Sequence, residues 1–230
     1  MWKKWEELPE FMQIDEVRPY WEILDHKKKQ IVVKRIVDIV FAGVLIVPLS
    51  APMAVVSILI KADSDGPVFF RQERVTAYGR HFRIHKFRTM KEGAEERGSS
   101  VTSSSDERIT AIGAVLRKYK LDEIPQVIDV LKGDMSFVGT RPEVVKYVEQ
   151  YAPEYYATLL MPAGITSEAS IRYLDEEILL DTSDNIERCY TEKILPEKMK
   201  INLGAVRNFS LAADARTVLS TIQSILKREH

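Results

Sequence analysis

The chain has 230 residues and a formal net charge of −1, with 45% apolar and 29% charged residues. This length can bury one good core. The composition is too apolar for a disordered chain, and its overall charge gives no indication of a nucleic-acid partner. A single cysteine, Cys189, excludes an internal disulfide framework and fits a reducing compartment. We expect one mostly helical α+β domain with a small β-hairpin and an appended apolar helix.

The N-terminal segment, residues 1–32, mixes aromatic and apolar side chains with Lys and Glu. The three tryptophans of the chain all lie here, and the apolar set comprises Trp2, Trp5, Leu8, Phe11, Tyr20 and Trp21. Such a mixture is typical of a segment that lies in the headgroup layer of a membrane. We therefore predict an amphipathic arm on a membrane surface.

The next segment is apolar from Ile36 to Ile60 and contains one charge, Asp38. Its 25 residues exceed the roughly 20 that cross a hydrocarbon core of about 30 Å. Lys34-Arg35 and Lys61 place positive charge at both ends, which favours both ends on the cytoplasmic side. The sequence thus indicates a membrane segment whose two ends face the same compartment.

The centre of this segment reads Pro48-Leu-Ser50-Ala-Pro52. Proline in a helix interior removes a hydrogen bond and clashes with the carbonyl four residues before it. We predict a re-entrant helix over residues 33–61 that breaks here and returns to the same leaflet, with Ser50 bonding the released carbonyls. A kinked spanning helix and a buried hairpin in a soluble core are the alternatives.

The remainder, residues 62–230, is predicted to form the globular domain. Two β-prone runs flank Thr76–Gly79 and predict a hairpin, and the Gly- and Ser-containing residues 91–107 predict a loop. Further along we expect helices over 109–119 and from Asp122 to Gly133, then a turn and short strand over 133–139. Arg141-Pro142 should open another helix, 162–164 should form a loop, and 186–207 and 214–228 should be helical.

Charge is unevenly distributed within this domain. Residues 71–91 carry seven Lys or Arg against one acid, interleaved with apolar residues, whereas residues 168–187 carry seven acids against one Arg. We interpret the acidic stretch as a solvated face. The basic stretch predicts a positive face on a strand pair, which suits a phosphate group or an anionic membrane surface.

The sequence KLDEIPQ at residues 120–126 places two carboxylates, Asp122 and Glu123, side by side after a basic run. First-turn acids that interact with a helix dipole are the commoner role of such a pair. The same dipole would keep a nucleophilic carboxylate ionised and attract a phosphate. The residues alone leave both roles open.

Several other polar residues have a structural and a functional interpretation. Arginine forks suit phosphate oxygens, so Arg141, Arg88, Lys86 and Arg117 are candidate phosphate ligands, with surface salt bridges as the alternative. His81 and His85 are too few for a zinc site and predict ordinary polar strand positions. We expect Asp38 to pair with a neighbouring Lys or Arg. We expect Lys34-Arg35 to set topology, with contact to lipid headgroups or to a substrate phosphate as the alternatives.

Taken in order, the motifs resemble those of the bacterial sugar transferases, the monotopic phosphoglycosyl transferases that act on polyprenyl phosphate. The resemblance covers about residues 33–210. It is carried by KR-x-x-D at 34–38, the proline-broken apolar segment, FRQ at 70–72, KFRTM at 86–90, LDEIPQ at 121–126, LKGDMSFVG at 131–139, RP at 141–142, GIT at 164–166 and LPEK at 195–198.

This resemblance implies transfer of a sugar-1-phosphate from a UDP-sugar to polyprenyl (undecaprenyl) phosphate on the cytoplasmic face of the inner membrane. UMP would leave, and the lipid-linked sugar would start an exopolysaccharide or other surface glycan. It implies that Asp122 is a nucleophile forming a phosphosugar-enzyme intermediate, and that Asp122 and Glu123 hold Mg²⁺. The implied substrate-binding residues are Lys86, Arg88, Arg117, Arg141, Pro142 and Thr166.

The chain departs from the family's pattern at three places. Ser50-Ala51 replaces the usual Ser-Pro, Thr140-Arg-Pro replaces Pro-Arg-Pro, and Ala163-Gly-Ile-Thr-Ser167 replaces Pro-Gly-Ile-Thr-Gly. The sugar of the donor is left open among GlcNAc, GalNAc, galactose, glucose and modified amino sugars, and so is the oligomeric state, a homodimer included. A non-catalytic membrane adaptor and a Mg²⁺-dependent lipid-diphosphate phosphatase are the competing functions.

Overall fold

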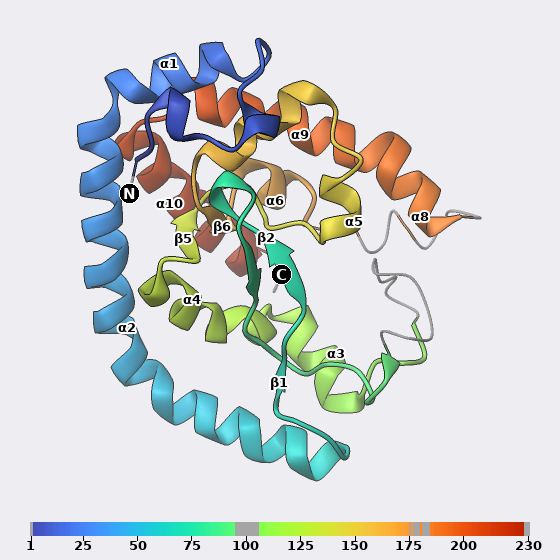
Figure 1. Ribbon diagram of the computed structural model, residues 1–230. Helices are drawn as coiled ribbons and strands as arrows, with labels where there is room; N and C mark the ends of the chain where they lie inside the picture. Colours follow the sequence, from blue (N-terminus) through green and yellow to red (C-terminus); the bar gives the residue numbers. More distant parts are fainter. Residues whose placement is uncertain (1, 95–105, 175, 177–179, 181–184, 228–230) are drawn as a thin grey trace.

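The computed structural model describes residues 2–94, 106–174, 176, 180 and 185–227, and most of the loop expected over 91–107 lies outside them. The fold is α+β with helices around short strand pairs (Figure 1). The α-helices are α1 (Arg18–His26), α2 (Lys28–Asp63), α3 (Ala111–Lys118), α4 (Val127–Lys132), α5 (Val145–Val148), α6 (Glu168–Arg172), α8 (Ile186–Cys189), α9 (Leu195–Arg207) and α10 (Leu211–Lys227).

Shorter helical turns and strands connect these helices. The turns are η1 (Trp5–Glu7), η2 (Glu10–Met12), η3 (Ala77–Gly79), η5 (Leu121–Gln126), η6 (Pro153–Leu160) and the π-helical η7 (Tyr190–Ile194). The strands are β1 (Phe69–Phe70), β2 (Glu73–Val75), β3 (His81–Arg83), β4 (Lys86–Phe87), β5 (Met135–Val138) and β6 (Ala163–Thr166).

Much of the N-terminal segment packs into the protein. Leu8, Met12, Val17, Tyr20 and Leu24 are buried in the largest apolar cluster, together with residues of α5, η6 and α9. Trp2, Trp5 and Trp21 pack against the same cluster and against one another. These side chains therefore stabilise the domain, and contact between this segment and a membrane surface stays a prediction.

Helix α2 is continuous over 36 residues and contains both Pro48 and Pro52, so the break that we expected is absent. Figure 1 shows instead that the helix axis bends as α2 runs around the domain. Prolines remove hydrogen bonds and are a usual cause of a bend. Ser50 Oγ donates to the carbonyl of Val47 at 2.6 Å, not to the carbonyls of Val44 and Pro48 from which the prolines remove the helical donors. The re-entrant arrangement stays a prediction.

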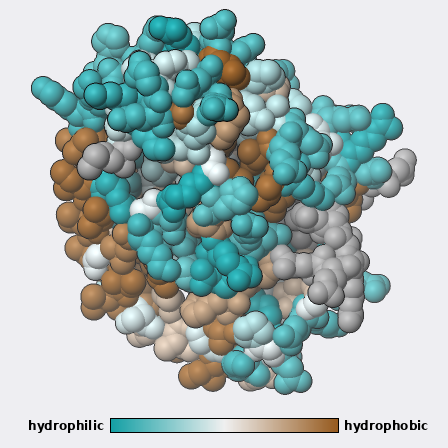
Figure 2. All heavy atoms as spheres, in the orientation of Figure 1, coloured by the Kyte–Doolittle hydropathy of each residue, from teal (hydrophilic) through white to brown (hydrophobic). Residues whose placement is uncertain are grey.

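The apolar surface of α2 is largely exposed. Its most apolar stretch of 18 residues has a mean hydropathy of 2.4 and is only 6% buried, so the helix is long and apolar enough to cross a membrane. Figure 2 shows hydrophobic side chains gathered on the side of the molecule where α2 runs. A buried hairpin in a soluble core is excluded by this exposure.

The polar residues near the start of α2 attach it to the domain. Lys34 Nζ lies 2.6 Å from Asp214 Oδ2 on α10, and Arg35 donates to the carbonyls of Val130 and Leu131 at the end of α4. Asp38 is buried and accepts from the backbone N–H of Phe137 at 3.3 Å. The prediction that Asp38 pairs with a neighbouring Lys or Arg is therefore wrong. These contacts direct Lys34 and Arg35 into the domain, and contact with lipid headgroups stays a prediction.

The predicted hairpin is confirmed. β2 pairs with β3 in antiparallel register, with Val75 opposite His81, and β1 pairs with β4 beyond it, with Phe69 opposite Phe87. The turn η3 reverses the chain through two residues of positive φ, Tyr78 and Gly79. This ribbon carries Lys86 toward the centre of the domain.

A third pair, which is parallel, joins β5 and β6, with Ser136 opposite Gly164. We expected a loop at residues 162–164, and we expected Arg141-Pro142 to open a helix, but α5 begins at Val145. The backbones of Gly139 and Gly164 approach so closely that a Cβ on Gly164 would clash with Gly139. Because the pair is parallel, the carboxyl ends of both strands lie together, with Thr166 at the end of β6 and Arg141 shortly after the end of β5.

Candidate active site

The Asp122-Glu123 pair lies in η5, a six-residue 3₁₀ helix between α3 and α4. Lys120 has a left-handed backbone (φ 55°), which ends α3 and turns the chain into η5. Pro125 lacks the N–H of a regular helix. The segment packs against β4 and α2. The two adjacent carboxylates are thereby held in the interior, although the sequence predicted an α-helix starting at Asp122.

Glu123 holds two cations that come from distant parts of the chain. Lys86 Nζ of β4 lies 2.8 Å from Glu123 Oε1. Arg141 contacts both carboxylate oxygens, at 2.5 Å from Oε1 and 3.2 Å from Oε2. The side chains of Glu123 and Lys86 are 12% and 15% exposed, and that of Arg141 is 33% exposed. The structure thus brings together three of the residues predicted for the site.

The ionisation of this trio follows from its geometry. Burial would raise the pKa of Glu123, but the charges and hydrogen bonds of Arg141 and Lys86 outweigh burial and hold the pKa well below 4.5. Burial lowers the pKa of Lys86, and the negative charge of Glu123 raises the pKa of Arg141. Glu123 is therefore an anion that is ion-paired with two cations.

Asp122 has a different environment. Its side chain is buried, and its Oδ1 has no hydrogen-bond partner among the described residues. Burial raises the pKa of Asp122, and the nearby charges of Lys86, Lys120 and Arg117 oppose that rise. An ionised Asp122 is a desolvated carboxylate with an unused oxygen, which is the state in which a carboxylate attacks phosphorus.

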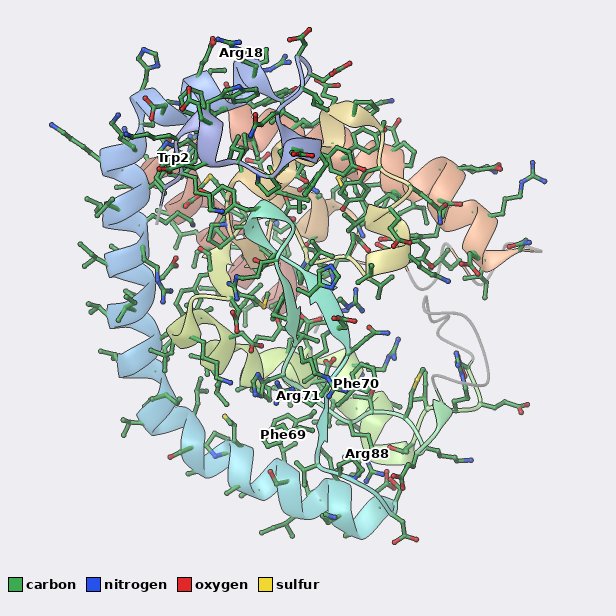
Figure 3. All side chains as sticks on the ribbon, viewed as in Figure 1. Trp2, Arg18, Phe69, Phe70, Arg71 and Arg88 are labelled. Atoms are coloured by element: carbon green, nitrogen blue, oxygen red, sulfur yellow. The ribbon has the colours of Figure 1, made fainter. Side chains whose placement is uncertain are left out.

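The other predicted ligands lie at different distances from this centre. Arg117 in the last turn of α3 acts electrostatically on Asp122. Arg88 turns away: its guanidinium donates to the carbonyls of Ser64 at 2.7 Å, of Ile60 at 3.4 Å and of Asp65. Figure 3 shows Arg88 beside the lower arm of α2. Because these contacts occupy it at the end of α2, Arg88 is not part of the cluster.

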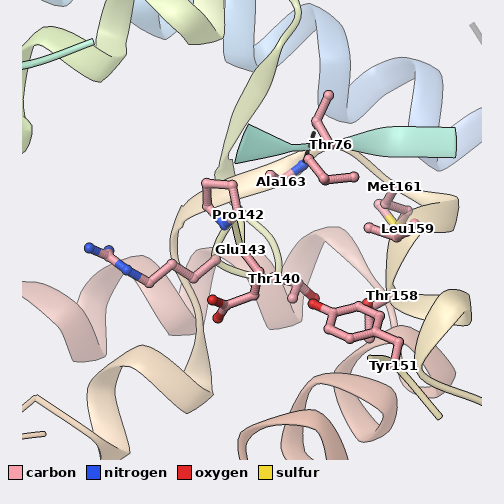
Figure 4. Close-up of a pocket in the computed structure, with 11 residues that line it drawn as sticks. Thr76, Thr140, Pro142, Glu143, Tyr151, Thr158, Leu159, Met161 and Ala163 are labelled. Carbon is pink, nitrogen blue, oxygen red and sulfur yellow. Dashed lines mark hydrogen bonds between the residues drawn. The ribbon is translucent and has the colours of Figure 1, made fainter. Parts of the chain in front are cut away.

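The segment after β5 and the residues that lead into β6 border a small cavity (Figure 4). Arg141 and Pro142 line it, and the Pro142 carbonyl accepts from Arg74 at 3.0 Å. Its volume is about 10 Å³, which suits one water molecule and neither a sugar nor a nucleotide. Thr166 lies at the end of β6, where its hydroxyl contacts Thr221 of α10 at 2.8 Å. Thr166 is therefore engaged with a helix, and its contact with substrate stays a prediction.

One buried pair next to the centre was missed from the sequence. Asp129 of α4 is fully buried and accepts from the backbone N–H of His85 at 2.8 Å, while its other oxygen lies 2.5 Å from His85 Nδ1. We had interpreted His85 as an ordinary strand residue. An acid within the apolar run VIDVL was the available signal, because a buried acid needs a partner. The pair attaches His85, the residue before Lys86, to α4.

The donor groups at the centre suit magnesium, which was predicted for Asp122 and Glu123. No group of three His, Cys, Asp or Glu side chains gathers in the part of the chain that the structure describes. Mg²⁺ usually takes only one or two carboxylates from the protein and completes its shell with water and substrate phosphates. The unpaired Asp122 Oδ1 beside Glu123 provides such a set.

Comparison with known proteins identifies relatives of this chain by sequence. A UDP-N-acetylgalactosamine-undecaprenyl-phosphate N-acetylgalactosaminephosphotransferase of Aeromonas hydrophila is 37% identical over 84% of this chain, which covers 44% of that protein. A UDP-glucose:undecaprenyl-phosphate glucose-1-phosphate transferase of Caulobacter vibrioides is 34% identical over 86% of this chain and 71% of its own length. The exopolysaccharide production protein PSS of Rhizobium leguminosarum is 33% identical over 86% of this chain and 97% of its length.

The chain thus spans less than half of the first relative and nearly all of the third. The sequence profile of one family, described as bacterial sugar transferase, matches residues 29–228. That match includes α2 except its first residue, the strand pairs and the whole Asp122–Glu123–Lys86–Arg141 cluster. The chain therefore belongs to the bacterial sugar transferase family.

Proposed function

We propose that this protein transfers a sugar-1-phosphate from a UDP-sugar to polyprenyl phosphate through a covalent intermediate on Asp122. The observation that carries the proposal is the buried Asp122 carboxylate with an unpaired oxygen, next to an ion-paired Glu123. The names of the undecaprenyl-phosphate relatives support the substrate classes. Those names include both N-acetylgalactosamine and glucose, so we assign the donor only as a UDP-sugar.

In the first step an oxygen of Asp122 attacks the phosphorus that carries the sugar. The new bond joins that oxygen to phosphorus, and the bond to the bridging oxygen of the diphosphate breaks, so UMP leaves with the electron pair. Total charge is conserved and no proton has to move. Arg141 and Lys86, both paired with Glu123 beside Asp122, would supply positive charge that stabilises the reacting phosphates.

In the second step a phosphate oxygen of the lipid attacks the same phosphorus. The bond to Asp122 breaks and regenerates the carboxylate, and the product is a polyprenyl diphosphate sugar. A covalent intermediate lets a soluble donor and a membrane-bound acceptor use one site in turn. We infer that Asp122 and Glu123 hold Mg²⁺, which when bound neutralises phosphate charge and stabilises the leaving group.

We place this protein on the cytoplasmic face of the inner membrane, with α2 re-entering the leaflet. Both halves of α2 pack on the same globular body: Ala42 joins one apolar cluster and Ile60 another. Lys34 and Arg35 attach the first half by polar contacts. A helix with both halves on one body favours two ends on the same side of the membrane. The site would then lie next to lipid, because η5 contacts α2.

The test is an acid-quenched reaction of purified protein with labelled UDP-sugar and no lipid. Wild type should become heavier by one phosphosugar at Asp122 and should release UMP in a burst that approaches one per active enzyme. Asp122→Asn should lose turnover by about 10³-fold or more and should show no adduct. Asp25→Asn, a carboxylate-to-amide change far away on α1, should leave both readouts unchanged.

Four results would contradict the proposal. Near-normal turnover by Asp122→Asn would remove Asp122 from the role of nucleophile. UDP as the nucleotide product would indicate cleavage at the anomeric carbon. Release of inorganic phosphate from a lipid diphosphate, or inertness of folded protein toward every UDP-sugar, would favour the phosphatase or the adaptor.

A further inference from the structure

One polar side chain in η5, that of Gln126, has no role in the mechanism described so far. Gln126, the last residue of η5, is 1% exposed, and neither its amide nitrogen nor its amide oxygen has a hydrogen-bond partner among the described residues. Burying an amide without partners costs free energy, so such groups are rare in native proteins. Gln126 therefore needs an explanation beyond the fold of the free protein.

The position of Gln126 relates it to the two carboxylates. A 3₁₀ helix has three residues per turn, so residues three apart lie on one face. Gln126 is three residues from Glu123, and both belong to the same six-residue segment as Asp122. Asp122 Oδ1 is also buried and unpaired. Unused hydrogen-bonding capacity thus gathers in the segment that carries the proposed nucleophile.

The charged neighbours leave a chemical role for this amide. Lys86 and Arg141 are both bonded to Glu123, and these three groups with Asp122 have no net charge when all are ionised. A side-chain amide is a neutral hydrogen-bond donor. Unlike Lys86 and Arg141, it is not held by the Glu123 carboxylate and is free to bond a phosphoryl oxygen. Preorganised neutral donors of this kind stabilise charge that develops in a transition state.

We infer that Gln126 is a further ligand of the transferred phosphoryl group, whose side-chain amide donates to an oxygen of the phosphorus that Asp122 attacks. This inference rests on the proposed function. It explains why the amide is unpaired in the free protein. Its partner is a phosphoryl oxygen that arrives with the UDP-sugar and stays with the phosphosugar on Asp122. Gln126 then contributes to both chemical steps.

The test compares stability with the rate of the UMP burst in Gln126→Met. Methionine has a similar length and no polar atoms to leave unpaired, so the urea midpoint should be unchanged or higher. Loss of the amide hydrogen-bond donor should slow the burst of UMP release by about 10- to 100-fold. Gln126→Glu should slow it further, because a carboxylate would repel the phosphate.

Ser136→Ala is the matched control. Ser136 on β5 is fully buried with an unpaired Oγ, but it lies outside η5. Its variant should keep both the urea midpoint and the burst rate of wild type.

A normal burst rate in Gln126→Met would overturn the inference. So would joint loss of stability and burst, which would place the amide in the fold and not on the substrate. The absence of a UMP burst in wild type would overturn the proposed function itself. This result is distinguishable from a failure of the inference on Gln126, because it is observed in the protein without any substitution.

Discussion

Asp122 and Glu123 are neighbours in the chain, yet their environments shift their pKa values in opposite directions. Burial dominates at Asp122 and raises its pKa, whereas Arg141 and Lys86 outweigh burial at Glu123 and lower its pKa. Two carboxylates with divergent pKa values can take different roles at one pH. This division supports a nucleophilic Asp122 and a Glu123 that organises cations.

The first prediction at this scale concerns the acid side of the pH–rate profile. The positive charge of Lys86 is the largest influence that opposes the burial-driven rise in the pKa of Asp122. Lys86→Met should therefore raise that pKa and move the acid limb of kcat/KM for UMP release to higher pH, besides lowering the rate throughout. Lys200→Met, at an exposed ion pair, should leave the limb in place. A limb that stays fixed in Lys86→Met would mean that Asp122 is not the titrating group.

The second prediction concerns folding stability and Glu123. Because the pKa of Glu123 in the folded protein lies below its unfolded value of 4.5, this carboxylate contributes stability above pH 4.5 that is lost as the pH falls below it. Glu123→Gln should lower the free energy of unfolding at pH 7 by on the order of 3 kcal/mol, because Lys86 and Arg141 lose their partner.

The deficit of Glu123→Gln should narrow as the pH falls below 4.5, because the carboxyl of the unfolded wild type then binds a proton while the folded protein, with its lower pKa, still holds Glu123 ionised. Urea titrations at a series of pH values measure this difference. Glu22→Gln, which breaks an exposed pair with Arg18, should cost about 1 kcal/mol or less at every pH. A deficit at Glu123 that is independent of pH would contradict the assigned ionisation.

At the scale of elements, local sequence predicted what local interactions decide. The hairpin followed from two β-prone runs around Thr76–Gly79, and the end of α4 followed from Gly133, whose φ is +85°. β6 could not be predicted in this way, because Pro162-Ala-Gly164 is typical of a loop and its strand exists only through pairing with β5. The direction in which a guanidinium points likewise depends on tertiary contacts. The sequence could therefore not distinguish Arg88, which binds carbonyls at the end of α2, from Arg141, which binds Glu123.

The contact of Gly139 with Gly164 gives a prediction for the β5–β6 pair. Gly164→Ala would force a Cβ into the backbone of Gly139, so we expect destabilisation of about 2 kcal/mol or more. The shift should also displace Arg141, which follows β5, and slow UMP release. Gly204→Ala in α9 has open space around its Cβ and should instead stabilise the protein by about 0.5–1 kcal/mol. Thermal unfolding and burst rates measure both variants, and equal effects at the two positions would refute this packing argument.

At the scale of the whole molecule, α2 is both the apolar surface and a structural support. Its outward side chains are exposed along most of its length, while Lys34, Arg35 and Asp38 fix it to α10, α4 and β5. Composition predicted the membrane segment, but it could not predict that the charges at its start would turn inward. The continuity of the helix through two prolines also differs from the local prediction of a break, and both of its halves pack on the domain.

This packing leads to a prediction about topology. Single cysteines at Lys29 and Lys61, which flank the apolar part of α2 and are exposed, would be tested in a Cys189→Ser background. Both should react with a membrane-impermeant thiol reagent only after cells are opened, as should a reference cysteine at the exposed Glu149 of the globular domain.

Replacing Pro48 and Pro52 together by Leu should straighten α2, because leucine restores the backbone donors that proline lacks. One flanking cysteine should then become reactive in intact cells. Both halves of α2 pack on the globular domain and oppose that change, so we expect only partial labelling. We also expect reduced UMP release, because one half of α2 would separate from the domain. Labelling of residue 29 or 61 in intact cells that carry both prolines would show that α2 spans the membrane, and the re-entrant arrangement would then be wrong.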